Sequence, residues 1–222
     1  MFLLDNISAK DIGVMAEDET FLSRAPINYE EIEIEGKHGS DFIEKNYSNL
    51  VGSLKLFLVD ATKLDFAKEM FTGLRTLTHN ERITTIRFYD VNEISRLGNI
   101  KVLSVKYTRA PFWHKADDEY VLCESTVTNE GNTVSYPSIK LVGVANQLVD
   151  LTIGKIRFTY KFDNHNEVFI DCAEQTETCE GLSKSKQINI GYEYPTLMPG
   201  ENWITVHSGT VQVYFMKKDA WL

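Results

Sequence analysis

Residues 148–173, LVDLTIGKIRFTYKFDNHNEVFIDCA, decide the fold class of this chain. Apolar and polar side chains alternate within three short runs, at residues 148–153, 155–162 and 167–173. A period of two is typical of β-strands that bury one face against a core. Gly154 separates the first two runs, and the polar residues 163–166 separate the second from the third, as turns require. The stretch therefore predicts three consecutive antiparallel strands.

The rest of the second half continues this pattern. Further strands are predicted at residues 120–128, 137–145, 186–190, 203–206 and 210–217. Pro199-Gly200 has the residue order that a type II turn prefers. The last two strands are expected to pair with each other around His207-Ser208-Gly209. Six to eight short strands with turns between them indicate an antiparallel β-sandwich or jelly roll.

The first half mixes strands with one helix. Strands are predicted at residues 29–36 (half-buried), 53–60, 84–90 and 99–108, the last with a bulge. Between residues 64 and 77, Ala67, Met70, Phe71 and Leu74 recur at helical spacing, and Thr62 with Asp65 resembles a capping box. The pattern changes at Ala110-Pro111-Phe112-Trp113. We therefore expect a mainly β protein, with a small α+β domain at residues 1–110 and a sandwich at residues 111–222.

Composition narrows the class of protein. The chain has 222 residues, is 43% hydrophobic and 25% charged, and carries a net charge of −9. Such a charge argues against nucleic acid as the main partner, because phosphate binding needs clustered Lys and Arg. No apolar run is long enough to span a bilayer. The segment Met1-Phe2-Leu3-Leu4 is followed at once by Asp5, which predicts a soluble, cytosolically made protein without a secretory signal.

Cysteine and histidine residues give no sign of a metal site or a disulfide framework. The three cysteines (Cys123, Cys172, Cys179) are odd in number, and their spacing is wider than that of a zinc knuckle. The five histidines (His38, His79, His114, His165, His207) are scattered. We interpret them as structural side chains, with small buried thiols among the cysteines, and we expect no cofactor.

No catalytic motif stands out either. We interpret two acidic groups as parts of solvated loops: Asp117-Asp118-Glu119, and Glu174 with Glu177. Asp171 is interpreted as the cap of a strand, with an Asx-type turn. His207 and Ser208 are adjacent in a predicted strand, so they face opposite ways. Residues 36–40 lack the context of a phosphate loop. The sequence therefore predicts no enzyme, although a β-sandwich hydrolase stays open as an alternative.

Aromatic residues leave a second alternative. Ten Tyr, three Trp and twelve Phe could form a sugar-stacking platform, as in lectins and carbohydrate-binding modules. Tyr and Trp are also enriched at protein interfaces. A carbohydrate-binding β-sandwich module is thus the runner-up function.

The order of these features resembles the distal tail protein (Dit) family of long-tailed siphophages that infect Gram-positive hosts. The resemblance rests on short segments that occur in the same order as in that family: residues 25–26, 34–39, the predicted helix, 110–113, 127–132, 135–139, 141–143, 169–172 and 197–202. It implies an N-terminal belt domain at residues 1–110 and a galectin-like sandwich at residues 111–222. The chain is short for that family and leaves no room for an inserted receptor-binding arm.

This resemblance implies a structural role in the virion. Such proteins form a homohexameric ring that joins the tail tube to tail-tip or baseplate proteins and to receptor-binding proteins, with DNA passing through the channel. The ring interface itself cannot be assigned to residues from the sequence. We further predict that some of the excess acidic side chains line the channel, so that passing DNA does not adhere to its wall.

Overall fold

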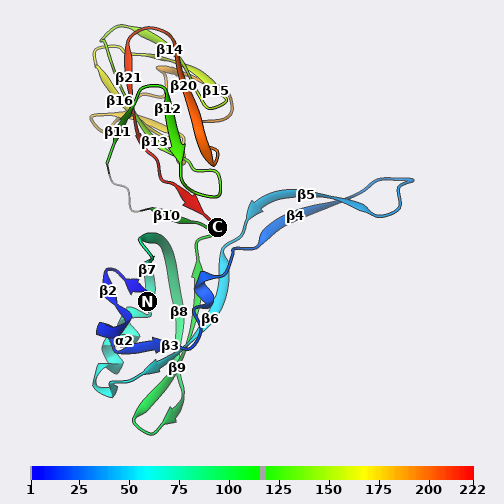
Figure 1. Cartoon of the computed structure of the whole chain (residues 1–222), viewed down its shortest axis with the longest axis vertical. Coiled ribbons are helices and arrows are strands. Elements are labelled where there is room, and N and C mark those ends of the chain that lie inside the picture. Colours follow the sequence, from blue (N-terminus) through cyan, green and yellow to red (C-terminus); the bar gives the residue numbers. More distant parts are fainter. Residues whose placement is uncertain (1, 116–118) are drawn as a thin grey trace. The chain divides into compact units, whose positions relative to one another are not determined.

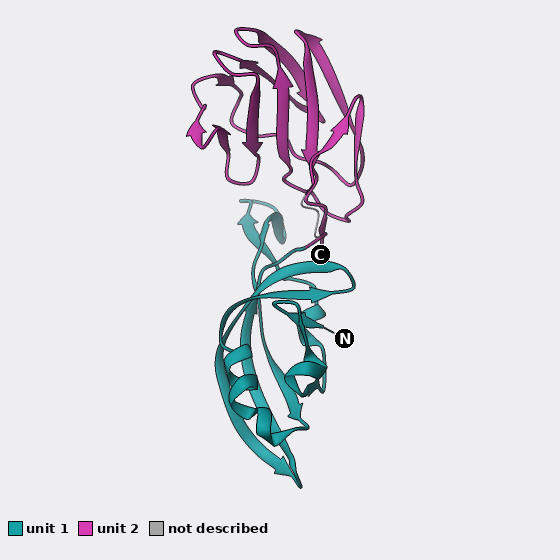
Figure 2. Cartoon of the chain, turned by 90° about the vertical axis from the view of Figure 1, so that its left-hand side faces the viewer, with its two compact units in different colours: residues 1–113, 222 teal, residues 114–221 magenta. Residues whose placement is uncertain are grey.

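The structure is a computed structural model that describes residues 2–115 and 119–222 (Figure 1). Most of these residues lie in β-strands, and the helices are few and short. The chain divides into two compact units, Met1–Trp113 with Leu222 and His114–Trp221 (Figure 2). The prediction of a mainly β protein with antiparallel sheets is confirmed.

Unit 1 is built on one curled antiparallel sheet, whose strands follow the order β2-β1-β7-β8-β9-β6-β3. Two short helices and two 3₁₀ turns accompany it. The bounds are β1 (Leu3–Leu4), β2 (Ile7–Ser8), α1 (Ala9–Ile12), β3 (Val14–Ala16), η1 (Thr20–Leu22), β6 (Leu50–Leu58), η2 (Ala61–Lys63), α2 (Leu64–Met70), β7 (Gly73–His79), β8 (Arg82–Leu97) and β9 (Ile100–Arg109).

One face of this sheet is buried. Leu54, Leu56 and Leu58 alternate with partly or fully exposed residues along β6, and β8 buries Ile86 and Phe88 in the same manner. Aromatic rings fill the core beside them, because Phe71 packs edge-on against Phe88 at 5.1 Å and Phe2 against Phe21 at the same distance. The core of unit 1 thus lies between the sheet and the segments that carry Phe2, Phe21 and Phe71.

The helix is shorter than the sequence indicates. It ends at Met70, and residues 73–79 form β7 instead, paired with β1 on one side and β8 on the other. Gly73 has φ +78°, which a continuing helix cannot accommodate. The expected stripe therefore holds only as far as Phe71, and Leu74 is 68% exposed. The predicted capping box was also wrong: Asp60, rather than Thr62, caps the preceding turn.

Strands β4 (Ile27–Glu33) and β5 (Ser40–Tyr47) form a separate two-stranded sheet. They extend as an arm away from the rest of their unit (Figure 1). A strand near residues 29–36 is confirmed, but its predicted half-burial is wrong, because Ile32 is 37% exposed and Ile34 is 47% exposed. The alternation correctly indicates a strand, whereas nothing in the described chain covers either face.

Unit 2 is a β-sandwich of two antiparallel sheets, ordered β11-β21-β13-β16-β17-β18 and β12-β20-β14-β15-β19. The bounds are β11 (Val121–Cys123), β12 (Thr126–Asn129), β13 (Ser138–Gly143), β14 (Leu148–Ile153), β15 (Ile156–Lys161), β16 (Glu167–Asp171), β17 (Thr176–Cys179), β18 (Leu182–Ser183), β19 (Ile188–Asn189), β20 (Gly200–Ser208) and β21 (Val211–Met216). In addition, β10 (Trp113–Lys115) pairs with β22 (Ala220–Trp221). One buried cluster draws side chains from both sheets, which confirms the predicted sandwich.

Two details of the strand order differ from expectation. The last two long strands do not form a hairpin, because β20 pairs with β12 and β14 while β21 pairs with β11 and β13. The turn at Gly209 (φ +84°) therefore carries the chain from one sheet to the other. Likewise, residues 120–128 form two strands, β11 and β12, in different sheets. In unit 1, the irregularities predicted for residues 99–108 lie in the partner strand β8.

Candidate assembly interface

The β4–β5 arm displays large apolar side chains on both faces. Tyr29 lies opposite Glu44 and Phe42 lies opposite Glu31, so these two aromatic rings share one face. Cross-strand pairing likewise places Ile32 and Ile43 on the other face. Tyr29 is 57% exposed and Phe42 is 66% exposed. An isolated two-stranded hairpin is at best marginally stable in water, so this arm is built to be covered.

The base of the arm is anchored to the body of unit 1. The Tyr47 ring packs edge-on against Phe112 at 5.4 Å, and the Arg24 guanidinium lies 6.0 Å from its centroid. Asn28 donates a hydrogen bond to Asn46 Oδ1 at 2.9 Å across the two strands. These contacts fix the end of the arm near the body while leaving the outer strands free.

The arm is also acidic. Within residues 27–47 stand six carboxylates (Glu30, Glu31, Glu33, Glu35, Asp41, Glu44) against two lysines (Lys37, Lys45). Both lysines are paired, Lys45 with Glu30 at 2.6 Å and Lys37 with Asp41. The remaining carboxylates leave a negative surface around the exposed rings. A surface that covers this arm should therefore combine apolar side chains with a basic group.

Such a combination lies on the open face of the unit 1 sheet. Leu74, Arg87, Thr108 and Val51 stand side by side in one row across β7, β8, β9 and β6. We call these four residues the open-face row. Leu74 is 68% exposed and Val51 64% exposed. A shallow depression of about 500 Å³ surrounds Leu74 and Arg87 and also includes Tyr89.

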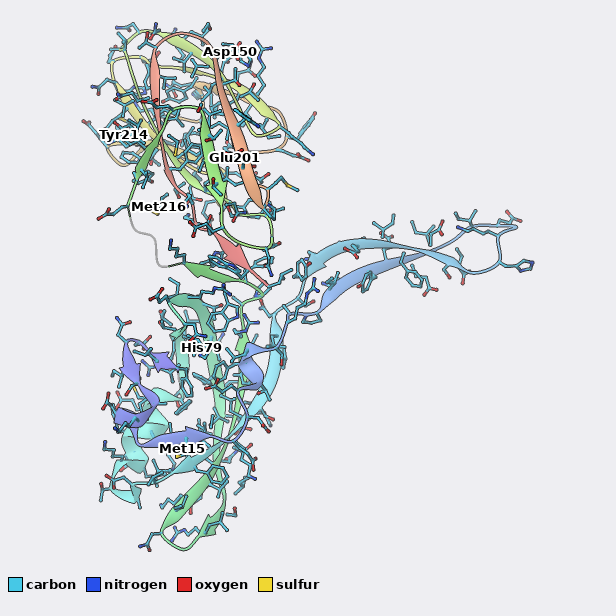
Figure 3. All side chains as sticks on the ribbon, viewed as in Figure 1. Met15, His79, Asp150, Glu201, Tyr214 and Met216 are labelled. Atoms are coloured by element: carbon cyan, nitrogen blue, oxygen red, sulfur yellow. The ribbon has the colours of Figure 1, made fainter. Side chains whose placement is uncertain are left out.

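An apolar groove of about 600 Å³ lies beside β3, the last strand of the sheet. Phe2, Val14, Met15 and Val59 line it, together with residues of the neighbouring turns. Met15, labelled in Figure 3, is 64% exposed. Because β6 is the one described strand that pairs with β3, this sheet edge has backbone groups available to a further strand. The open-face row and this groove are thus both open surfaces of the described part of unit 1.

The acidic residues singled out by the sequence do not converge. Asp117 and Asp118 lie outside the described residues, while Glu119 and Glu174 are exposed. Glu177 is the exception to the predicted loop: it belongs to β17, is 1% exposed and accepts a hydrogen bond from the Tyr194 hydroxyl. Hydrogen bonding to a tyrosine makes it a structural carboxyl of the sandwich interior.

The remaining candidates have structural roles. Asp171 accepts hydrogen bonds from the backbone of Ala173 and Glu174, which confirms the predicted turn. His207 contacts Thr152, with its Nε2 2.8 Å from the hydroxyl oxygen. The three cysteines are free; Cys172 and Cys179 are buried as predicted, and burial raises the pKa of the Cys172 thiol to about 12. Among residues 2–115 and 119–222, no cluster of three or more potential metal ligands occurs.

Buried side-chain amides hold the backbone of two segments noted in the sequence, residues 129–132 and residues 199–200. The Asn129 side chain donates to the carbonyls of Thr133 and Leu197 and accepts from the backbone of Gly131. Asn202 spans the Pro199-Gly200 turn by bonding Met198 and Gly200. Gly200, the first residue of β20, has φ +90°, a backbone conformation that favours glycine. These turns position strands of the sandwich rather than a reactive group.

Comparison with known proteins gives two kinds of match. Residues 130–219 match the family described as "Siphovirus-type tail component, C-terminal domain". The whole chain aligns with the Dit (gp 19.1) protein of phage SPP1, described as "a Paradigm of Hub Adsorption Apparatus in Gram-positive Infecting Phages". This alignment has a TM-score of 0.76 at 13% identity and covers 100% of this chain and 98% of that one.

A chain from the "Structure of the Phage P2 Baseplate in its Activated Conformation with Ca" also aligns. Its TM-score is 0.45 at 8% identity, with 96% of each chain covered. No curated protein matches the sequence. Among the described residues, no helix is long and apolar enough to cross a membrane.

The two-unit β fold and the matched domain together define a structural component of a phage tail, and the protein belongs to the virion. Residues 130–219 match the C-terminal domain of the siphovirus-type tail components, and the whole chain shares the fold of the SPP1 Dit protein. The resemblance predicted from the sequence is confirmed. The matched family is described as a tail component, and the aligned SPP1 chain as part of a hub adsorption apparatus.

Proposed function

We propose that this protein forms a homohexameric ring that joins the tail tube to the tail-tip and receptor-binding proteins. The observation that carries the proposal is the arm, which exposes Tyr29, Phe42, Ile32 and Ile43 with nothing in the described chain to cover them. Identical copies can bury such an arm head to tail, and a head-to-tail contact closes into a ring when its rotation divides a full turn.

The counterpart of the arm is the open-face row of the next copy. Leu74 and Val51 offer apolar surface, and Arg87 between them offers the positive charge that the acidic arm lacks. Burying an aromatic ring of the arm there would remove two exposed apolar patches at once. In this arrangement unit 1 forms the ring, and the sandwich is free to serve as an attachment point for neighbouring tail proteins.

The decisive experiment is the mass of the purified full chain in solution, measured by light scattering and followed by negative-stain imaging. The proposal expects rings of six copies that persist on dilution to micromolar concentrations. A chain that stays monomeric at every concentration tested, including that of the assembled tail, would refute the proposed ring.

The net charge of −9 supports a second element of the proposal, namely that the channel surface is partly acidic. Like charges keep double-stranded DNA from binding the wall as it passes. Filter binding of linear DNA to purified rings at moderate salt tests this element. Tight binding would contradict it while leaving the ring itself untouched.

A further inference from the structure

The outer face of the five-stranded sheet of unit 2 has an unusual composition. Trp203 on β20 is 64% exposed although its neighbours Asn202 and Ile204 are buried. Among the described outward-facing residues of β12, β20, β14 and β15, it is the one Phe, Tyr or Trp side chain. A large flat ring held on the solvent side of a regular strand contributes little to the core, so its position calls for another explanation.

Hydrogen-bonding side chains surround this ring in register. Thr126 lies directly opposite Trp203, and two residues along β20 Thr205 lies opposite Thr152, which in turn lies opposite Arg157. Residues two apart in a strand are separated by about 7 Å, and neighbouring strands by about 4.8 Å. The hydroxyls of Thr126 and Thr205 therefore stand close to the indole, whereas Arg157 lies about 12 Å away, within reach of further rings of an oligosaccharide.

Several of these polar groups are held in place. Arg157 binds Asp150 through two parallel hydrogen bonds, at 3.0 Å from Nε and 2.6 Å from Nη2. His207 Nε2 lies 2.8 Å from the Thr152 hydroxyl oxygen. Asp150 and Glu201, labelled in Figure 3, lie at opposite ends of β20: Asp150 pairs with Ser208, and Glu201 lies near its start. Preorganised polar groups lose little conformational freedom when a ligand binds.

We infer that this face, centred on Trp203, is a binding site for a neutral glycan. The apolar face of one pyranose ring would stack on the indole and its hydroxyls would bond the neighbouring threonines, while further rings of the glycan would reach the Arg157–Asp150 pair. Because Arg157 and Asp150 offset each other's charge, the site favours an uncharged sugar. A protein partner fits less well, since the core of a protein interface needs several apolar side chains together, and here polar groups surround Trp203 while the exposed Leu148 lies at the far end of β14.

An array of neutral oligosaccharides built from hexoses and N-acetylhexosamines, probed with the full chain, tests the site. The best-bound glycan is then titrated against Trp203→Ala, Trp203→Tyr and, as a control, Tyr192→Ala, since Tyr192 is a fully exposed aromatic residue outside this face. We expect at least a tenfold loss of affinity for Trp203→Ala, a smaller loss for Trp203→Tyr, and wild-type affinity for Tyr192→Ala.

Three outcomes would overturn the inference: no glycan bound at millimolar concentration, unchanged affinity in Trp203→Ala, or a tail protein that requires Trp203 while no glycan binds. The solution mass of each variant is measured alongside. Since Trp203 lies in unit 2 and the ring is assigned to unit 1, a failed glycan site with intact rings is distinguishable from a failed ring.

Discussion

The side-chain amide of Asn129 donates a hydrogen bond of 2.9 Å to the carbonyl oxygen of Leu197, a residue 68 positions further along the chain. The same amide also binds Thr133 and Gly131, so that all its polar groups have partners although it is 1% exposed. The amide thereby connects the backbone of residues 131–133 to the segment that leads into β20. Within the sandwich, this contact links the end of β12 to the segment before β20, its neighbour in the same sheet.

Asn129→Ala should destabilise the sandwich by about 3 kcal/mol, because three backbone groups lose a buried partner. Amide hydrogen exchange measured residue by residue separates opening of unit 2 from that of unit 1. The exposed Asn164→Ala is the matched control and should change stability by less than about 0.5 kcal/mol. Equal exchange rates in the two variants would show that the amide contributes little.

How far the sequence predicts this fold depends on whether the deciding contact is local. Strands β14, β15 and β16 follow the alternation and turns of residues 148–171, because both signals lie within each segment. The partner of β21 could not be read in that way: Gly209 indicates a turn, and a turn alone does not reveal whether the next strand joins the same sheet. Pairing with β1 and β8 similarly overrides the helical spacing that ends in Leu74.

The candidate interface was less predictable than the fold. Alternation at residues 29–36 identifies which side chains share a face, but it cannot show whether a second layer covers that face. The open-face row is also beyond sequence analysis, because Leu74 and Val51 come together only through three strand pairings. By contrast, the buried side-chain amides of Asn129 and Asn202 hold the backbone within residues 127–132 and 197–202, two of the segments on which the family resemblance rests.

A second prediction concerns the arm. Phe42→Asp should convert rings into monomers, since it places a further charge on an already acidic surface and removes a ring that a neighbouring copy would bury. Unfolding of the monomer should be unchanged, because Phe42 has no part in either core. Leu182→Asp, at a 65% exposed leucine of unit 2, is the control and should leave the rings intact. Light scattering reports both results, and intact rings in Phe42→Asp would exclude the arm as the ring contact.

The proposed counterpart of the arm makes a separate prediction. Leu74→Asp on the open-face row should weaken rings as Phe42→Asp does, because the two side chains are expected to meet across the subunit contact. Arg87→Glu should have the same effect at low salt, where the attraction between Arg87 and the acidic arm is strongest. Dissociation is measured by sedimentation velocity over a concentration series. If only the arm variant dissociates the rings, the arm binds elsewhere, and the groove beside β3 becomes the next surface to test.

Gly52 should tolerate no side chain. A Cβ atom there would lie 2.6 Å from the hydroxyl oxygen and 2.8 Å from Cζ of Tyr107, a buried residue that also donates to Thr20. Gly52→Ala should therefore destabilise unit 1 by about 1–3 kcal/mol through overpacking. Gly191→Ala places its Cβ where no atom lies within 4 Å and should be nearly neutral. Urea unfolding of both variants makes the comparison, and similar midpoints would mean that Tyr107 can move aside.

Asp171 should make the sandwich sensitive to acid. Burial raises the pKa of its carboxyl, but hydrogen bonds from Lys218 and from the backbone of Glu174 and Ala173 outweigh burial and hold the pKa below its ordinary value. A carboxyl with a depressed folded-state pKa stabilises the fold fully above its unfolded-state pKa, about 3.9, and loses that contribution as the pH falls through the folded-state value. The stability of the wild-type sandwich should thus decline more steeply below about pH 4 than that of Asp171→Asn. The exposed Glu174→Gln should keep the wild-type slope, and parallel curves for wild type and Asp171→Asn would show that this carboxyl is not the group responsible.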